Sequence, residues 1–160
     1  MRPAHRWDDM KKPRGSGQIE QVRQQYAALP FRRAAGLEVL LITSRETRRW
    51  VVPKGWPMKG RRPPGTAARE ALQEAGVVGL ISKTSIGSFT YIKRGLGGQS
   101  WPCRVDVFPL QVRAERTEWR ERAQRTRQWF SFIEAATAVT EPELKTLILA
   151  FGVAFDRVKT

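Results

Sequence analysis

Two glutamates and a glutamine, spaced three and four residues apart, could together hold a metal ion. They are Glu70, Gln73 and Glu74, in the stretch PPGTAAREALQEAG. Side chains at positions i, i+3 and i+4 are neighbours on the surface of an α-helix, so these three can reach one cation. A hard ion such as Mg²⁺ takes oxygen ligands, usually one or two carboxylates completed by waters and phosphate oxygens. The alternative is an ordinary solvated helix face, so the triplet is a candidate metal site that needs further support.

A strongly basic loop directly precedes these acids. Lys54, Lys59, Arg61 and Arg62 lie in the run PKGWPMKGRR, and Arg49 lies just before it. Guanidinium and ammonium groups suit ligands with several phosphates, because they combine positive charge with hydrogen-bond donors. The loop and the helix together predict a site where cations bind phosphates beside a metal ion. Ordinary surface charge is the alternative for each cation taken alone.

The helix that must carry the acids has sequence signals at both ends. Pro63 and Pro64 stand at or near the first helical position, where no amide donor is lost, and Gly76 suits a left-handed cap at the other end. An advance of 100° per residue places small apolar residues on one side and the polar triplet on the other. We expect the polar triplet to face outward and the apolar side to pack on a sheet. The apolar residues are Ala68, Ala71, Leu72 and Ala75.

Strand signals surround this helix. Residues 36–44 predict a largely buried strand, and residues 50–55 predict a second strand that pairs with it as a hairpin. Residues 85–94 and 101–115 predict another hairpin across a glycine-rich turn, and 128–132 a short strand. Apolar spacing near 3.6 residues predicts helices in residues 131–140 and 141–155. The expected fold is α/β, with a mixed sheet and helices on its faces.

Composition favours one domain and phosphate-rich partners. The chain has 160 residues, 41% of them hydrophobic, which suffices for one core and not for two. We expect a flexible basic arm at residues 1–18 and a single domain at residues 19–160. Lys and Arg number 29 against 15 Asp and Glu, a formal net charge of +14 that favours association with phosphates.

Cysteine usage and hydropathy bear on the cellular compartment. Cys103 is the one cysteine, which excludes a disulfide within the chain and suits a reducing compartment. No apolar run approaches the roughly 18 residues of a membrane-spanning helix, and the N-terminus lacks the apolar region of a signal peptide. We therefore expect a cytoplasmic protein without a membrane partner.

The spacing of loop and helix resembles the Nudix box, G-x5-E-x7-R-E-U-x-E-E-x-G-U, where U is a bulky aliphatic residue. Three positions depart from the pattern: Arg61 stands at the first Glu, Ala71 at an aliphatic position and Gln73 at the second-last Glu. The matching positions are Gly55, Arg69, Glu70, Glu74, Gly76 and Val77.

A second resemblance, to the diphosphoinositol polyphosphate phosphohydrolase branch of the Nudix family, extends over nearly all of residues 25–149. That branch has an acidic-aromatic segment followed by a basic run and a Trp-Phe pair. Membership would imply a Nudix α/β/α sandwich with a mixed central sheet, and cleavage of a diphosphate linkage with Mg²⁺ or Mn²⁺. The residues that carry this second resemblance are Glu118, Trp119, Arg125, Arg127, Trp129 and Phe130.

The resemblance also implies roles for the residues of the box. Glu70 and Glu74 become metal ligands, one of them alternatively a base, and the Gly55 carbonyl becomes a further ligand. Arg69 is expected to orient the acids through a salt bridge, and the Gln73 amide can coordinate without adding charge. The general base is open: Glu118 and Glu121 are candidates because their loop can fold over the site, although a solvent-facing role is the alternative for both.

The departures leave more than one function in view. The leading hypothesis is metal-dependent hydrolysis of phosphoanhydride bonds in a highly anionic substrate, such as a diphosphoinositol polyphosphate or a dinucleoside polyphosphate. The alternative is a catalytically weakened module that binds nucleotide, polyphosphate or RNA, since Gln73 and Arg61 remove negative charge from the metal site. A protein that binds nucleic acid through its charge alone is the weakest of the three hypotheses, because no RNA-binding signature is present.

Overall fold

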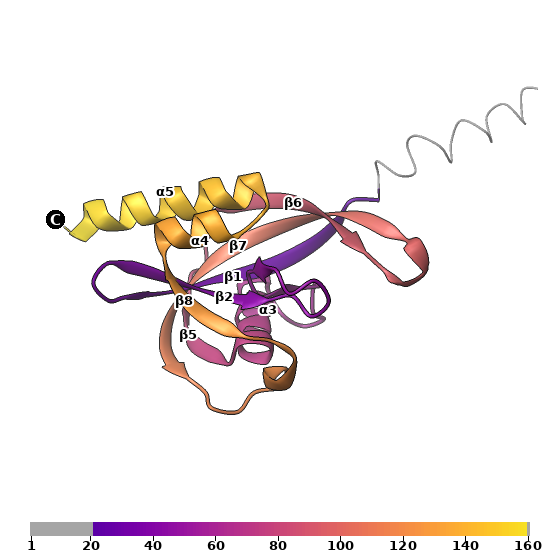
Figure 1. Ribbon diagram of the computed structural model, residues 1–160, viewed down its shortest axis with the longest axis horizontal. Coiled ribbons are helices and arrows are strands. Elements are labelled where there is room, and N and C mark those ends of the chain that lie inside the picture. Colours follow the sequence, from indigo (N-terminus) through magenta and orange to yellow (C-terminus); the bar gives the residue numbers. More distant parts are fainter. Residues whose placement is uncertain (1–20, 160) are drawn as a thin grey trace, which may run out of the picture.

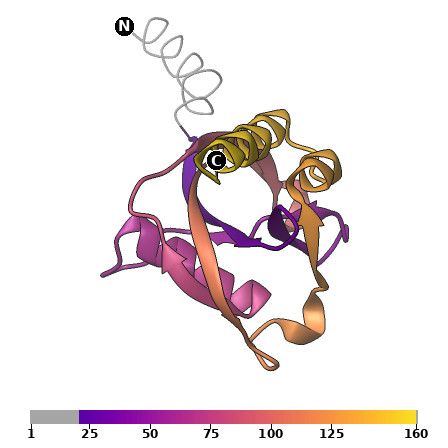
Figure 2. The ribbon, with the colours of Figure 1, turned by 90° about the vertical axis from the view of Figure 1, so that its left-hand side faces the viewer.

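A computed structural model describes residues 21–159 of the chain, and their strands form one sheet with helices against both of its faces (Figures 1 and 2). The expected arm at residues 1–18 lies outside the described residues. The helices are α3 (Pro63–Glu70), α4 (Phe132–Ala138) and α5 (Pro142–Lys159). The strands are β1 (Arg23–Arg33), β2 (Leu37–Thr43), β3 (Trp50–Val51), β4 (Lys54–Gly55), β5 (Val77–Ile81), β6 (Gly87–Arg94), β7 (Ser100–Glu115) and β8 (Arg127–Ser131).

Strand β1 lies at the centre of the sheet and makes the sheet mixed. It runs parallel to β7, from the Arg23–Cys103 pair to the Phe31–Gln111 pair, and antiparallel to β2 and β4. The sequence did not predict this strand, because its middle is Ala27 to Pro30, and alanine and proline are both uncommon in strands. The segment is a strand because it pairs with β2, β4 and β7, and not because its own residues favour strand structure.

The hairpins expected from the sequence are confirmed. Strand β2 pairs with β3, and β6 pairs with β7 across the glycine-rich turn. The expected strand at residues 50–55 is instead two short strands, because Pro53 separates them and each pairs with a different neighbour: β3 with β2, and β4 with β1. Because β4 pairs with the central strand β1, Lys54 and Gly55 lie at the centre of the sheet, next to the helix that carries the acids.

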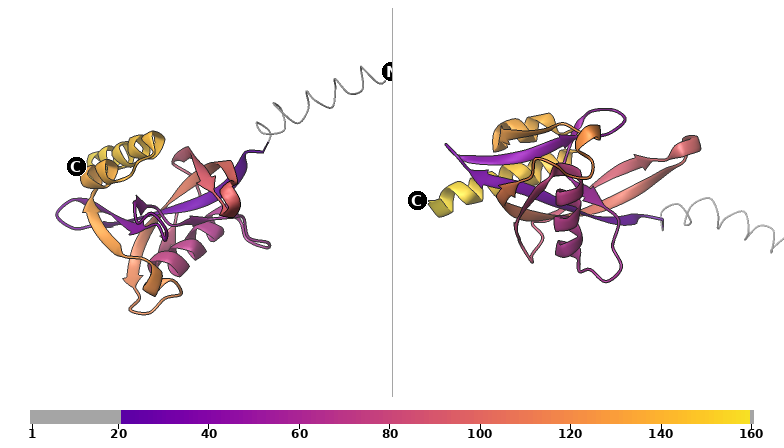
Figure 3. Two further views of the ribbon diagram at one scale, coloured as in Figure 1. Left: turned by 45° about the vertical axis from the view of Figure 1, so that its right-hand side comes forward. Right: turned by 90° about the horizontal axis from the view of Figure 1, so that it is seen from below.

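Apolar side chains alternate between the two faces of the sheet. From β1, Ala27 and Leu29 pack in the core beneath α4 and α5, while Ala28 packs in the core beneath α3. Strand β2 divides in the same way, as a strand buried on both faces must. Figure 3 shows α3 on one face and the two C-terminal helices on the other. The α/β/α sandwich with a mixed sheet is therefore confirmed.

Candidate active site

The helix of the box changes its pitch halfway along. Helix α3 begins at Pro63, as expected, and Gly76 ends the segment in the left-handed conformation with φ 69° and ψ 30°. Between them, Ala71–Ala75 forms a π-helical turn, labelled η1, in which each bond spans one residue more than in an α-helix. Such turns are frequent at functional sites.

The π-helical turn alters which residues face the sheet. Ala67, Ala71 and Ala75 are fully buried, whereas Ala68 and Leu72 are half-buried, so the expected apolar face was partly wrong. In the wider turn, positions four residues apart stay closer to one line than an advance of 100° per residue assumes. Because alanine side chains are small, the helix lies close to β1 and β5. With this face of the helix against the sheet, the side chains of Glu70 and Glu74 also turn inward.

Glu70 and Glu74 point inward rather than outward, which corrects the expected solvent-facing triplet. Glu70 is only 8% exposed and its carboxylate lies against Gly55, where even a methyl group would overlap it. Oε1 of Glu74 accepts a hydrogen bond from the backbone N–H of Lys54 at 3.2 Å. Gln73 is half-buried, and its backbone carbonyl accepts from the N–H of Glu121. Gly55, Glu70 and Glu74 are thus brought together by β4 and the helix.

The two inward carboxyl groups act on each other's protonation. The pKa of Glu70 is raised to about 8, first by burial and then by the charge of Glu74 and a hydrogen bond shared with it. Burial also raises the pKa of Glu74, against the opposing charges of Arg125 and Lys54. Two carboxyl groups this close favour either a shared proton or a cation between them.

Arg125 supplies one positive charge to this cluster from the segment after β7. Its side chain is 9% exposed, with Nη2 at 3.6 Å from Oε2 of Glu74 and Nε at 2.7 Å from Oε1 of Glu121. Nη1 donates to the carbonyl of Thr43 at 3.1 Å. The sequence had pointed to Arg125 only through the family resemblance, not as a site residue.

The structure separates the two candidates for the general base. Glu121 joins the cluster, because its charge raises the pKa of both Glu70 and Glu74. The Glu118 side chain is 82% exposed and its one ion pair within the described chain is a surface contact with Arg122. Glu121 is therefore near the metal-site candidates and Glu118 is not.

The expected phosphate-binding cations fall into two groups. Lys54 is half-buried, with Nζ over the ring of Tyr91 at 4.9 Å, and burial lowers its pKa to about 8. Arg49 forms an ion pair with Glu141, with Nη1 at 2.9 Å from Oε2. The others, Lys59, Arg61 and Arg62, are exposed and form no ion pair within residues 21–159.

Arg69 does not form the salt bridge expected of it. Its side chain is exposed and pairs with no acid in the part of the chain that the structure describes. The acid expected at the start of the box is absent, because Arg61 stands there. Arg125 instead provides the guanidinium that contacts Glu74.

The segment from Arg116 to Arg127 ties down the end of the π-helical turn. The indole N–H of Trp119 donates to the carbonyl of Glu74 at 3.2 Å, and Nη1 of Arg127 donates to the carbonyls of Ala75 and Gly76 at 2.9 and 3.3 Å. The Arg127 guanidinium also stacks on the Trp119 ring at 4.0 Å. A helix end leaves such carbonyls without partners, so this segment completes the element that carries the acids.

The donor set suits a hard divalent cation that is completed by its ligands. No group of three or more His, Cys, Asp and Glu side chains within residues 21–159 is arranged to hold a metal by itself. Glu70 and Glu74, with the Gly55 carbonyl, match the one or two carboxylates that Mg²⁺ takes when waters and phosphate oxygens supply the rest. The mutual repulsion of the two carboxylates is relieved by a bound cation, so the residues fit the ion.

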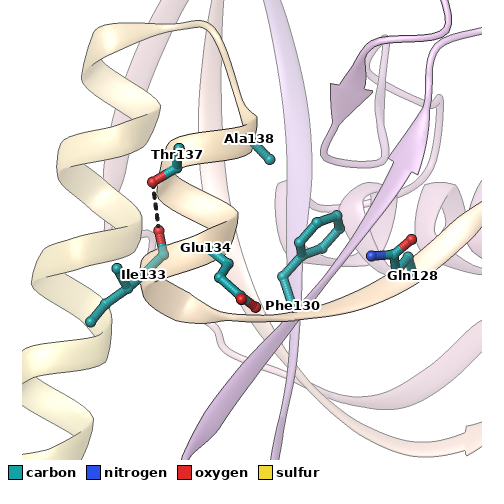
Figure 4. Close-up of a pocket in the computed structure, with 6 residues that line it drawn as sticks. All are labelled: Gln128, Phe130, Ile133, Glu134, Thr137 and Ala138. Atoms are coloured by element: carbon teal, nitrogen blue, oxygen red, sulfur yellow. Dashed lines mark hydrogen bonds between the residues drawn. The ribbon is translucent and has the colours of Figure 1, made fainter.

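A separate pocket of about 380 Å³ lies between β8 and α4, away from these residues (Figure 4). Its lining is Gln128, Phe130, Ile133, Glu134, Thr137 and Ala138, with none of the expected site residues among them. Glu134 is the one acid in this lining, and its Oε1 accepts a hydrogen bond from the backbone N–H of Ser131, the residue that caps α4. No Lys or Arg is among these lining residues, so the pocket offers no positive charge to a phosphate.

Among known proteins, sequence comparison finds Nudix hydrolases. No protein-family model matches the chain. Nudix hydrolase 12, mitochondrial, from Arabidopsis thaliana is 33% identical over 62% of this chain and 50% of that protein. Diphosphoinositol polyphosphate phosphohydrolase 3-alpha from Mus musculus is 34% identical over 72% of this chain and 68% of that protein. The chain spans about half the length of the plant relative.

Structural comparison finds the same fold. The crystal structure of a binary complex of the C. elegans Ap4A hydrolase has a TM-score of 0.62 over 82% of this chain and 96% of that one, at 19% identity. At that identity the likeness concerns the fold alone. Within the described residues, no helix combines the length and apolarity needed to cross a membrane.

Proposed function

The chain belongs to the Nudix hydrolase family, and from this premise we propose that it hydrolyses a phosphoanhydride bond in a highly anionic substrate with Mg²⁺ or Mn²⁺. The observation that supports this most is the pair of inward carboxyl groups, with Glu70 buried against Gly55 and Glu74 bonded to the N–H of Lys54. A carboxylate pair with a raised pKa and an exposed cationic loop beside it is an arrangement for a metal and a phosphate together.

Each residue of the site has a proposed role. Glu70 and Glu74 hold the cation, with the Gly55 carbonyl and the Gln73 amide as further oxygen donors. The cation, when bound, neutralises phosphate charge and makes water a better nucleophile. Arg125 holds Glu74 and Glu121 in place through the contacts described above. Arg69, exposed on the same helix, contributes positive charge near the acids.

Glu121 is the proposed general base. Oε1 is held by Arg125, while Oε2 accepts no hydrogen bond within residues 21–159 and is available to take a proton from the attacking water. Glu118 is less suited, because it lies in solvent.

Phosphate binding falls to the cations at the front of the site. Lys54 has no carboxylate within ion-pairing distance among the described residues, so its ammonium is available to a phosphate oxygen. Lys59, Arg61 and Arg62 attract the charged ligand from solvent, and Arg49 adds charge behind Lys54. The names of two similar proteins, a diphosphoinositol polyphosphate phosphohydrolase and an Ap4A hydrolase, suggest the substrate class. A cytoplasmic location is part of the proposal, although the plant relative is named mitochondrial.

A substrate panel with a matched variant tests the proposal. Product release is measured with diadenosine tetraphosphate, a diphosphoinositol polyphosphate and ADP-ribose, in Mg²⁺, in Mn²⁺ and in EDTA. The substitution Glu74→Gln keeps the shape of the side chain and removes its charge; Glu46→Gln does the same on the exposed turn before β3 and is the control. We expect metal-dependent turnover that falls by about 100-fold or more in Glu74→Gln and is unchanged in Glu46→Gln.

Two outcomes would contradict hydrolysis. Turnover that persists in EDTA or in Glu74→Gln would show that these acids do not hold the working ion. No turnover on any substrate, together with tight binding of the same compounds, would favour the binding module, in which Gln73 and Arg61 have weakened the metal site.

A further inference from the structure

Glu141, outside the carboxylate cluster, is a buried acid with only one of its two oxygens bonded. It precedes α5 and is 8% exposed. Oε2 receives a hydrogen bond from Nη1 of Arg49 at 2.9 Å, whereas Oε1 is fully buried and has no donor within the described residues. A buried acceptor without a donor costs free energy, and such groups in native proteins need an explanation. A donor from outside the chain would supply it.

Contacts from three elements place Glu141 at the phosphate-binding end of the site. Arg49 joins Glu141 to the hairpin before β4, and Glu143, two residues further on, accepts from the N–H of Thr90 at 2.7 Å. The residue after Thr90 is Tyr91, whose ring lies under the ammonium of Lys54. Lys54 in turn donates its backbone N–H to Glu74. Lys54 is therefore the residue between the metal-site acids and Glu141.

Lys54 contacts both parts of this arrangement. Its backbone N–H bonds to Glu74, and its ammonium lies over Tyr91, the neighbour of the Thr90 that bonds to Glu143. A diphosphate bound at Lys54 would thus have the metal-site acids on one side and Glu141 on the other.

We propose that, when substrate binding moves the side chains that cover it, Oε1 of Glu141 accepts a hydrogen bond from a neutral donor group of the substrate, a hydroxyl or amino group attached to the diphosphate. This rests on the proposed function and narrows its substrate class to nucleoside-type diphosphates. A sugar or base carries such donors, whereas an inositol ring with a phosphate on every carbon has none. That ring would also bring negative charge towards a buried carboxylate, which selects against it. Sites that bond a substrate hydroxyl or amino group discriminate strongly against ligands that lack one.

Binding measurements test this independently of turnover. Isothermal titration of the full chain with ADP and with inositol hexakisphosphate, each with Mg²⁺, compares wild type, Glu141→Gln and Glu141→Ala. The glutamine keeps an acceptor oxygen and removes the charge, so ADP should bind within about threefold of wild type and inositol hexakisphosphate about tenfold more tightly. The alanine removes the acceptor, and ADP should bind about tenfold more weakly.

Glu143→Gln is the matched control. Glu143 lies two residues after Glu141 and is exposed, so the substitution removes one negative charge from the same region, and the glutamine oxygen can still accept from the N–H of Thr90. It should change the ratio of the two affinities by less than about twofold. Thermal melts check that each variant is folded, and Glu141→Gln decides the outcome if the alanine variant is not. ADP compared with 2′-deoxy-ADP and with inosine diphosphate shows whether a ribose hydroxyl or the base amino group is the donor.

The proposal is overturned if Glu141→Gln leaves the ratio of the two affinities unchanged, or if Glu143→Gln shifts it equally. A solvent molecule would then be the donor to Oε1. Failure of the proposed hydrolase looks different: ADP selectivity that depends on Glu141 would persist without metal-dependent turnover.

Discussion

Two segments adjoin the acidic helix, and they use their cations in opposite ways. In the loop before the helix, Lys59, Arg61 and Arg62 are exposed and unpaired within residues 21–159. In the segment after β7, Arg125 and Arg127 are largely buried and bonded to carboxylates and backbone carbonyls. Both segments are basic in sequence. The first is suited to a ligand that arrives from solvent, and the second holds the helix in place.

The largest effect should be a loss of stability on replacing Arg127, whose side chain holds the end of the acidic helix. Arg127→Leu loses hydrogen bonds to the carbonyls of Ala75, Gly76 and Arg116 and the stacking on Trp119. We expect the free energy of unfolding to fall by about 3 kcal/mol, measured by urea denaturation.

The matched control for Arg127 is Arg122→Leu, in the same segment. Arg122 is exposed and has only a surface ion pair, so its loss should change stability by less than about 0.5 kcal/mol. Equal effects of the two substitutions would show that the segment does not depend on its buried cations.

A smaller effect should come from pH, which tests whether Arg125 already neutralises the acids. The pKa of Glu70 is raised from 4.5 to about 8 on folding, so the folded chain holds a proton that the unfolded chain has lost. Without metal, stability should therefore fall as pH rises from about 5 to 8, by on the order of 2 kcal/mol. Urea denaturation in EDTA at several pH values measures this change.

Two further measurements assign the pH effect. Mg²⁺ at pH 8 should restore stability, because a bound cation replaces the proton, and Glu70→Gln should flatten the pH dependence. A flat profile in the wild type would mean that the charge of Arg125 suffices for Glu70, Glu74 and Glu121 together.

The smallest effect should come from the exposed loop. Lys59→Ser with Arg61→Ser should weaken substrate binding about fivefold at low salt, with less effect at high salt and none on stability. Lys83→Ser with Arg113→Ser removes the same charge from exposed positions elsewhere and should leave binding within about twofold. Identical losses in the two double variants would reduce the role of the loop to net charge.

The features that were predictable from sequence are those set by neighbours along the chain. The proline start of α3, the left-handed Gly76 and the two hairpins depend on local backbone preferences, and all are confirmed. The spacing of Gly55, Glu70 and Glu74 led to the right family. The inward direction of the two glutamates could not be predicted, because it depends on a π-helical turn and on the approach of β4.

Tertiary structure alone decided which of several similar charges belong to the site. Glu118 and Glu121 lie three residues apart in one charged run, yet only Glu121 reaches Arg125 beside Glu74. Arg49 meets Glu141 across 92 residues, and β1 becomes a central strand through partners distant in sequence. The sequence by itself determined the helix, the hairpins and the motif, because these depend on short-range geometry. The partners of each charge depend on long-range packing, which gives two equal side chains different surroundings.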